Sequence, residues 1–379
     1  MEPVEKNNSK LSPGDSKTKD LFQSDQAKNP SLKHKSGRVS RREFILGAVP
    51  IVFASDFILS RKQLSTFPSD GNSGDKVSDK LTIIDTHVHF FDPTRAIPVG
   101  RDLPIPWPSS KTSPFYKTTM PSDWETLAKP LGMKGTIVVE AGTNWLEDND
   151  WILKLAERNR SIVGFIGNLS GTAIEQGSTV PVWDNMERYR KEVHRLAKNP
   201  LFRGIRVIGR SVFNDLNNGH YPHFEILADA DLVVDVNSVP AADIVALARA
   251  VPSLTIVVDH MFGFKAASSS SDKWRSDIAN LGEVQNIVMK VSGLVEGFDS
   301  PQTNASGTLI NCRGALDHVY ESFGPDRLIF ATNWPVSQPK GEMSLVTDVV
   351  RRYFEPRGKD VLAGVFAGNA RKFYNYLDR

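Results

Sequence analysis

The sequence predicts an α/β fold and, within that class, a (β/α)₈ TIM barrel over residues 81–379. Two observations carry this prediction. From residue 81 onward, eight short apolar runs rich in β-branched residues alternate with stretches of helical pattern. The first run is not followed by the glycine-rich fingerprint of an open dinucleotide-binding sheet, the competing architecture. The length also suits a barrel, which typically takes about 250 residues.

Most of the eight runs are continuously apolar, as is typical of parallel strands covered on both faces. Their predicted ranges are 81–85, 135–140, 162–167, 204–208, 232–236, 254–259, 286–291 and 327–331. Helices are expected between them, for example over 151–159, 183–198, 241–250, 274–281 and 308–323. Because barrel enzymes place their chemistry at the carboxyl ends of the strands, the residues that end each run are the first candidates for function.

The chain ahead of the barrel is expected to contain three segments. Residues 1–39 are rich in Ser, Lys, Asp, Asn and Pro and predict a disordered tail. Residues 40–60 contain Arg41 and Arg42 before an apolar run that is shorter than the about 20 residues of a membrane-spanning helix. This pattern resembles a twin-arginine export signal, with residues 61–80 as a linker. We therefore expect the twin-arginine machinery to export the protein to the periplasm, free or anchored facing it. The alternative is an ordinary amphipathic helix.

Composition narrows the function further. A formal net charge of +2 gives no indication of a nucleic-acid partner. The single cysteine, Cys312, lies in a predicted helix, where a buried inert thiol is the expected state. The connection over residues 90–122 is long and rich in Pro, Ser and Trp, so we expect it to cover the active site.

The strongest functional pattern ends the first predicted strand, where residues 84–89 read Ile-Asp-Thr-His-Val-His. Side chains alternate faces along a strand, so His87 and His89 point the same way, toward the barrel axis. Two imidazoles at this spacing can bind one divalent ion. The alternative, a core histidine satisfied by a backbone carbonyl, is less favoured in a chain with only 8 histidines.

The motif at residues 85–93 resembles the opening motif of the amidohydrolase superfamily. More narrowly, it resembles the amidohydrolase-related group of metal-dependent hydrolases and lactonases. Further matches follow in order at residues 204–206, 257–260, 290–294, 327–330, 333–336 and 368–370. The resemblance spans residues 81–379. It implies a metal-assisted hydrolase that binds a divalent ion, zinc first and manganese second, and a small carboxylate or lactone substrate.

The other strand-end residues each allow more than one interpretation. His260 can be a third metal ligand or a base that contacts substrate, or else a buried structural histidine. Glu140 can bind the metal or orient a ligand histidine. Arg206 can grip a substrate carboxylate, or pair with Glu140 or Asp235.

Four further side chains have expected roles. Lys290 is expected to form a structural ion pair rather than a Schiff base. Trp107, Trp145 and Trp334 lie in strand-end loops, where they are candidate stacking walls for a substrate ring. Plain packing is the alternative for these three tryptophans.

The sequence departs from the family at Asn333. The resemblance implies an Asp here, which ligates the metal and takes the proton from the attacking water, but an amide cannot act as a base near neutral pH. The fifth strand also lacks the histidine that many members carry. The expected metal site is therefore His87, His89, His260 and Glu140, with His260 and Asn333 as catalytic candidates.

Three scenarios fit this departure. The enzyme can use a metal with another base, such as His260, Asp235 or Glu140. It can work without a metal, or it can bind a ligand without catalysis. The first scenario, a metal with another base, is favoured. Because the site lacks the aspartate at position 333, we expect it to cleave an ester-like bond rather than an amide. We expect hydrolysis of a lactone of a sugar acid or cyclic carboxylate. The alternatives are a metal-assisted decarboxylase and an exported binding protein.

Overall fold

The computed structural model describes residues 81–96, 108, 114–141, 145–170, 173–209, 221–269 and 271–379. The predictions for the tail, the export signal and the linker, and for Trp107, lie outside these residues. No helix in the described part of the chain is both long and apolar enough to cross a lipid bilayer.

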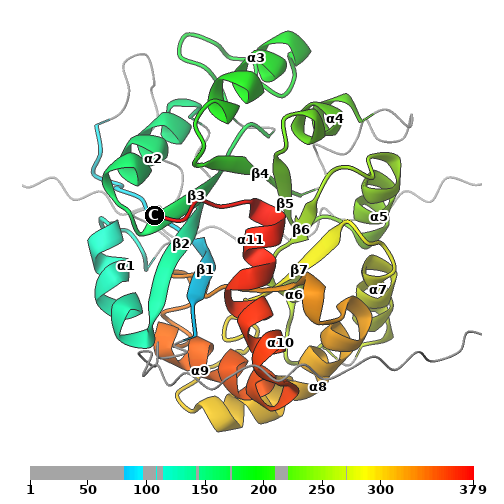
Figure 1. The fold of residues 1–379 in the computed structure, drawn as a ribbon. Helices are drawn as coiled ribbons and strands as arrows, with labels where there is room; N and C mark the ends of the chain where they lie inside the picture. Colours follow the sequence, from blue (N-terminus) through cyan, green and yellow to red (C-terminus); the bar gives the residue numbers. More distant parts are fainter. Residues whose placement is uncertain are drawn as a thin grey trace, which may run out of the picture. The chain divides into compact units, whose positions relative to one another are not determined.

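Eight parallel strands form one sheet in the order β1 to β8 (Figure 1). All eight predicted strands are confirmed, with ends shifted by a few residues. Each strand pairs in parallel with the next one along the chain, which is the topology of a barrel rather than of a doubly wound sheet. The bounds are β1 Ile83–Val88, β2 Met133–Val139, β3 Ile162–Gly167, β4 Phe202–Ile208, β5 Val233–Asn237, β6 Ile256–Val258, β7 Ile287–Val291 and β8 Leu328–Phe330.

The seam between β8 and β1 makes the barrel nearly closed. Val88 forms an isolated parallel bridge with Trp334, just beyond the end of β8. Lower in the seam, the Thr86 hydroxyl donates a hydrogen bond to the Phe330 carbonyl over 2.8 Å. A backbone bridge and a side-chain hydrogen bond thus join the two edges of the sheet.

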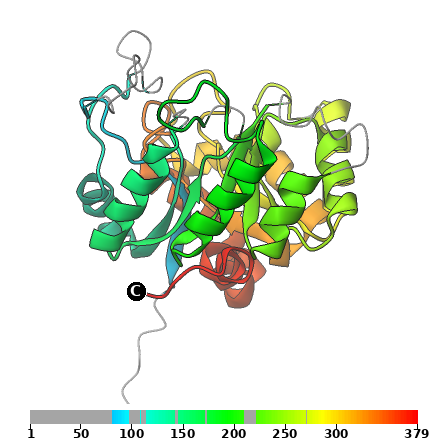
Figure 2. The same ribbon diagram turned by 90° about the horizontal axis from the view of Figure 1, so that it is seen from above.

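Helices surround the strands, and the connecting loops gather at one end of the barrel (Figures 1 and 2). The predicted helices over 151–159, 183–198, 241–250, 274–281 and 308–323 correspond to α2, α3, α5, α7 and α8. The bounds are α1 Pro121–Ala128, α2 Glu147–Arg158, α3 Met186–Ala197, α4 Pro222–Asp229, α5 Ala241–Ala250, α6 His260–Gly263, α7 Asp272–Gly282, α8 Ala305–Phe323, α9 Met343–Phe354, α10 Lys359–Ala363 and α11 Asn369–Tyr374.

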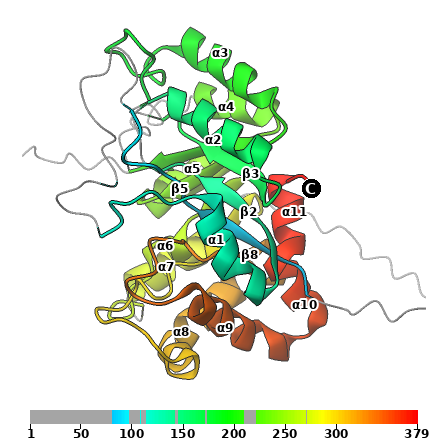
Figure 3. The same ribbon diagram turned by 90° about the vertical axis from the view of Figure 1, so that its left-hand side faces the viewer.

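Helix α11 lies across the amino-terminal end of the barrel, opposite the loops (Figures 2 and 3). Ala370 and Tyr374 pack there with Ile84, Val257 and other strand residues in an interior apolar cluster. Burying such side chains stabilises the fold by about 25 cal/mol per Å² of apolar surface. The amino-terminal end is thereby covered, and the carboxyl ends of the strands carry the functional residues.

Cys312 lies in α8 and is fully buried, as predicted. Burial raises the pKa of its thiol to about 12. The reactive form of cysteine is the thiolate, so this side chain is an inert part of the core.

Candidate active site

His87 and His89 come together at the carboxyl end of β1. Their Nε2 atoms lie 3.1 Å apart, and both rings are buried. Zinc–nitrogen bonds of about 2.0–2.1 Å hold two tetrahedral ligand atoms about 3.3 Å apart. The spacing of the two rings therefore suits two ligands of one ion.

The second ring nitrogen of His89 fixes how this histidine can act. Nδ1 lies 2.9 Å from the carbonyl oxygen of Val139, which can only accept a hydrogen bond. A neutral ring therefore carries its proton on Nδ1 and leaves the Nε2 lone pair toward His87. Burial, with a contribution from Arg206, lowers the pKa of His89 to about 3, so the ring is neutral at physiological pH.

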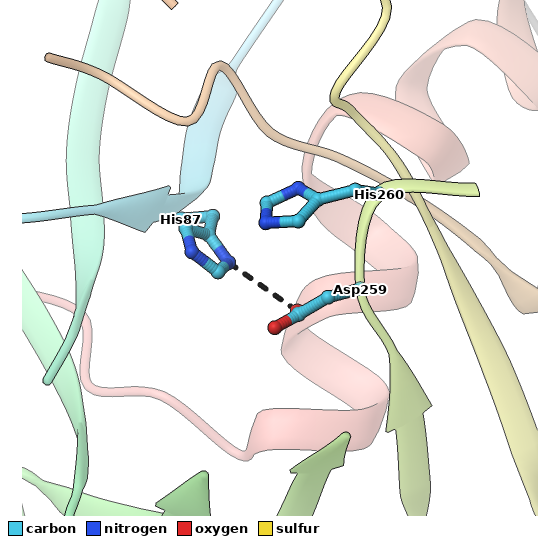
Figure 4. A group of neighbouring side chains, drawn as sticks. All are labelled: His87, Asp259 and His260. Atoms are coloured by element: carbon cyan, nitrogen blue, oxygen red, sulfur yellow. Dashed lines mark ion pairs between the residues drawn. The ribbon is translucent and has the colours of Figure 1, made fainter. Parts of the chain in front are cut away.

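The Nδ1 side of His87 faces a buried ion pair. This atom lies 3.3 Å from a carboxylate oxygen of Asp259 and 3.1 Å from the Lys290 ammonium. Figure 4 shows the carboxylate of Asp259 and the ring of His260 approaching His87 from the end of β6. Burial holds the pKa of His87 well below its usual value, although Asp259 opposes this.

His260 is held in place by its backbone and by Ser292. Its φ is +53°, and Met261 and Phe262 follow in the same left-handed region. Its Nδ1 lies 2.9 Å from the Ser292 hydroxyl, and its ring centroid is 4.5 Å from that of His87. Gly293, with φ +68°, permits this arrangement, because a Cβ there would lie 2.6 Å from the His260 Cβ. Burial lowers the pKa of His260 to about 4.

A chain of buried charges lies beneath the histidines. The Lys290 ammonium is fully buried, 2.5 Å from Asp235 and 3.0 Å from Asp259, which confirms the predicted structural ion pair. The Tyr374 hydroxyl donates to Asp235 from the far side, over 2.9 Å. Burial raises the pKa of Asp235 to about 6, whereas Lys290 and His87 outweigh burial at Asp259 and hold its pKa low. Asp235 is thus enclosed by Lys290 and Tyr374.

The ligand atoms of His87, Asp259 and His260 lie within 4.8 Å of one another. Both Asp259 carboxylate oxygens are buried and accept no hydrogen bond from the described residues, although Oδ1 lies 3.0 Å from the Lys290 ammonium and 3.3 Å from His87 Nδ1. Lys290 already supplies one positive charge beside Oδ1, whereas Oδ2 remains a buried acceptor. Two imidazoles and one carboxylate are a donor set that a divalent ion can use. The sequence interpretation missed Asp259, although the residue directly precedes His260 in the same strand-end motif.

Glu140 is not brought into this group. Its carboxylate accepts a hydrogen bond from Arg206 Nε over 2.7 Å, and its backbone carbonyl accepts one from Nη2 over 3.0 Å. Of the two interpretations of Arg206, the structure shows the ion pair. Both side chains are buried, and the pair ties β2 to β4 at the rim of the site.

A pocket of about 390 Å³ opens at the carboxyl ends of the strands. Four of the predicted site residues line it: His89 and His260 from the metal site, Arg206 from the substrate site, and Asn333 after β8. The lining residues are His89, Ala141, Arg206, Ile208, Asn237, His260, Asn333 and Val336. A volume of this size accommodates a single small ring.

Asn333 sits in the loop after β8 with φ +59°, a conformation that asparagine tolerates better than most residues. Its Nδ2 donates a hydrogen bond to Glu296 Oε1 over 2.7 Å. Glu296 follows β7 and was not among the predicted site residues. Burial raises the pKa of its carboxyl group to about 7.

Trp145 and Trp334, the two candidate substrate-binding tryptophans within the described residues, do not line this pocket. Trp145 is 4% exposed and packs against Arg95, whose guanidinium carbon is 5.7 Å from the ring centroid. Trp334 is 3% exposed and makes an edge contact with Phe90. Neither lines the pocket of His89 and His260, so packing accounts for both contacts.

Together, these features define a class of protein. A parallel eight-stranded barrel with a histidine–carboxylate group at the carboxyl ends of its strands has the architecture of a metal-assisted barrel enzyme. The chain belongs to the amidohydrolase family, whose Amidohydrolase model matches residues 84–376.

Three comparisons place the chain among its relatives. It is 29% identical over 314 residues to an L-fucono-1,5-lactonase of Burkholderia ambifaria, with 78% of this chain and 96% of the relative covered. A crystal structure of a Burkholderia multivorans amidohydrolase with bound zinc has a TM-score of 0.62 and 22% identity, covering 78% of this chain and all of that one. A dihydroxybenzoic acid decarboxylase from Polaromonas with bound manganese has a TM-score of 0.50 and 15% identity, covering 78% and 96%. The two structural matches establish the shared fold alone.

Proposed function

We propose that this protein is a metal-assisted hydrolase that opens the lactone of a sugar acid. The observation that carries the proposal is the 29% identity to an L-fucono-1,5-lactonase over nearly all of that enzyme's length. The pocket supports it, since His89, His260 and Arg206 converge there at the strand ends.

We propose that the divalent ion is zinc or manganese and that its candidate ligands are His87, Asp259 and His260, with His89 beside the other ring nitrogen of His87. A bound ion of this kind activates water and polarises a carbonyl oxygen. The neutral tautomer of His89, fixed by Val139, keeps Nε2 ready to ligate. The Ser292 hydroxyl, which can donate or accept, contacts Nδ1 of His260 and orients its ring.

Among the described residues that line the pocket, no side chain offers an unpaired positive charge to a substrate carboxylate. The Arg206 guanidinium is paired with Glu140 at 2.7 Å, so it does not present a free positive charge to the pocket. The pKa values of the buried histidines are lowered, so the rings are neutral, and the Lys290 ammonium is paired with Asp235 and Asp259. A lactone of a sugar acid carries no charge and offers hydroxyl groups and a carbonyl oxygen as hydrogen-bonding partners.

Asn333 favours an ester-like bond over an amide. With an amide at this position, the site lacks a strong base at the end of β8. A strained lactone needs less help from a base than a peptide or amide bond, because its alkoxide leaving group departs more readily than an amine.

Purified full-length protein, supplied with zinc or manganese, is expected to release acid from members of a panel of sugar-acid lactones. The release is followed with a pH indicator against the spontaneous rate. Turnover of six-membered sugar lactones above that rate is the expected result. No turnover of any member, with carbon dioxide released from an aromatic carboxylate instead, would replace the hydrolase by a decarboxylase. Binding of lactones without any turnover would indicate a binding protein.

We also propose export through the twin-arginine pathway, supported by Arg41 and Arg42 ahead of the apolar run over residues 44–59. In a bacterial host, cell fractionation should find the protein beyond the cytoplasm. Replacing both arginines with lysine should retain it inside. Equal distribution of the two proteins would contradict the proposal.

A further inference from the structure

Glu296 is a buried carboxyl group immediately behind the pocket. It lies five residues beyond Val291, the end of β7, and its side chain meets Asn333, which lines the pocket. Oε1 accepts the Asn333 amide hydrogen over 2.7 Å. Oε2 is buried and has no hydrogen-bond partner among the residues that the structure describes.

This contact determines which end of the Asn333 amide a ligand can meet. An ionised carboxylate only accepts hydrogen bonds, so it engages Nδ2 and leaves Oδ1 as the amide atom for the pocket. A protonated carboxyl can donate instead, which allows the amide to turn and present its NH₂ group. Asn333 thus offers an acceptor in one protonation state of Glu296 and a donor in the other.

The surroundings of Glu296 set where this change occurs. Lys265, from the segment after α6, is the charged side chain whose field acts on it, and its ammonium donates to the Glu296 backbone carbonyl over 3.2 Å. From the β8 side the facing group is Asn333, which is uncharged. Burial outweighs both and raises the pKa of Glu296 to about 7, within the physiological range.

We propose that Glu296 is a positioning residue that controls the hydrogen-bonding polarity of Asn333, so that the pair replaces the single carboxylate that the family motif carries at the end of β8. As a carboxylate, Glu296 holds Asn333 with Oδ1 toward the pocket, where it accepts a hydrogen bond that orients the attacking water, while the proton of that water passes to another group. When Glu296 is protonated, it no longer holds the Asn333 amide in this orientation. The inference rests on the proposed hydrolase for its catalytic part only.

The first test is the pH profile of lactone hydrolysis. A group with a pKa of about 7 is about one-tenth ionised at pH 6 and about nine-tenths at pH 8. Wild-type kcat/KM, corrected for spontaneous hydrolysis, should therefore rise about tenfold over that interval. In Glu296→Gln the side-chain oxygen still accepts from Asn333 but does not titrate, so the ratio should fall to about one. Glu283→Gln, a change at an exposed glutamate, should keep the wild-type profile. A tenfold rise that persists in Glu296→Gln would overturn the proposal.

The second test does not depend on activity. The folded-state pKa of Glu296 lies above the usual glutamate value of about 4.3, so the proton stabilises the folded state at low pH. The Tm of wild type relative to Glu296→Gln should fall as pH rises from 5 and should level off above about 7. Asn333→Ala removes the amide donor. In this background, the Tm difference between glutamate and glutamine at position 296 should level off at a higher pH.

The two tests separate the two claims. A wild-type protein that hydrolyses no lactone contradicts the proposed function, whereas the Tm comparison still reports on Glu296. A Tm difference that does not vary with pH, or an Asn333→Ala variant with an unchanged levelling point, overturns the inference itself.

Discussion

Replacing His87 with alanine is expected to release the bound divalent ion and to lower kcat/KM by about a thousandfold. His87 lies at the centre of the site, with its Nε2 beside His89 and its Nδ1 beside Asp259. A metal ion contributes several kcal/mol to the stabilisation of the transition state, and each about 1.4 kcal/mol is a factor of ten in rate. Elemental mass spectrometry should find about one ion per chain in the wild type and almost none in the variant.

The matched control is His194→Ala, which removes an exposed histidine of α3. It should keep both the ion and the rate. Circular dichroism and the Tm check that His87→Ala is folded. A full equivalent of metal in His87→Ala would refute the ligand set. A wild type that holds no metal after exposure to zinc or manganese would favour hydrolysis without a metal.

The second large effect is expected for Lys290→Met, which should destabilise the fold by about 3–5 kcal/mol. Lys290 is fully buried between Asp235 and Asp259. Removing one partner of a buried ion pair leaves uncompensated charge in a medium of low dielectric constant, and here two carboxylates remain. Denaturant unfolding at neutral pH measures the loss.

Two comparisons make this result specific. Lys273→Met removes an exposed ammonium from a surface pair with Asp277 and should cost at most about 1 kcal/mol. Lowering the pH should reduce the difference in unfolding free energy between Lys290→Met and wild type, because the unpaired carboxylates in the variant then take up protons. A loss below about 1 kcal/mol in Lys290→Met, or a difference that widens in acid, would contradict this account.

The strand order of the barrel could be predicted because buried parallel strands leave a strong local signal. Runs such as residues 162–167 are apolar throughout, and that range matches β3 without any shift. The ends were harder to place. β1 continues through Val88 although Thr86 and His87 are polar, and its register with β2 shifts between Asp85 and Val88. Helices α1 and α4 are short and begin at prolines, so their periodicity is weak over so few residues.

The site was predictable where chemistry and strand ends coincide in the sequence. His87, His89 and His260 stand at such positions, and the structure brings them together. The residues that contact the site residues could not be predicted from local sequence patterns, because they come from distant segments of the chain. Ser292 is 32 positions from His260, and Glu296 is 37 positions from Asn333.

The close approach of Gly293 to His260 restricts how this protein can evolve. Any other residue at 293 would place a Cβ 2.6 Å from the His260 Cβ in a backbone conformation that favours glycine. Selection should therefore preserve this end of the pocket almost unchanged. Ala141, Ile208 and Val336 line the same pocket through apolar side chains that carry no charge. Libraries varied at these three positions are the route by which new substrates can be recruited without rebuilding the reactive centre.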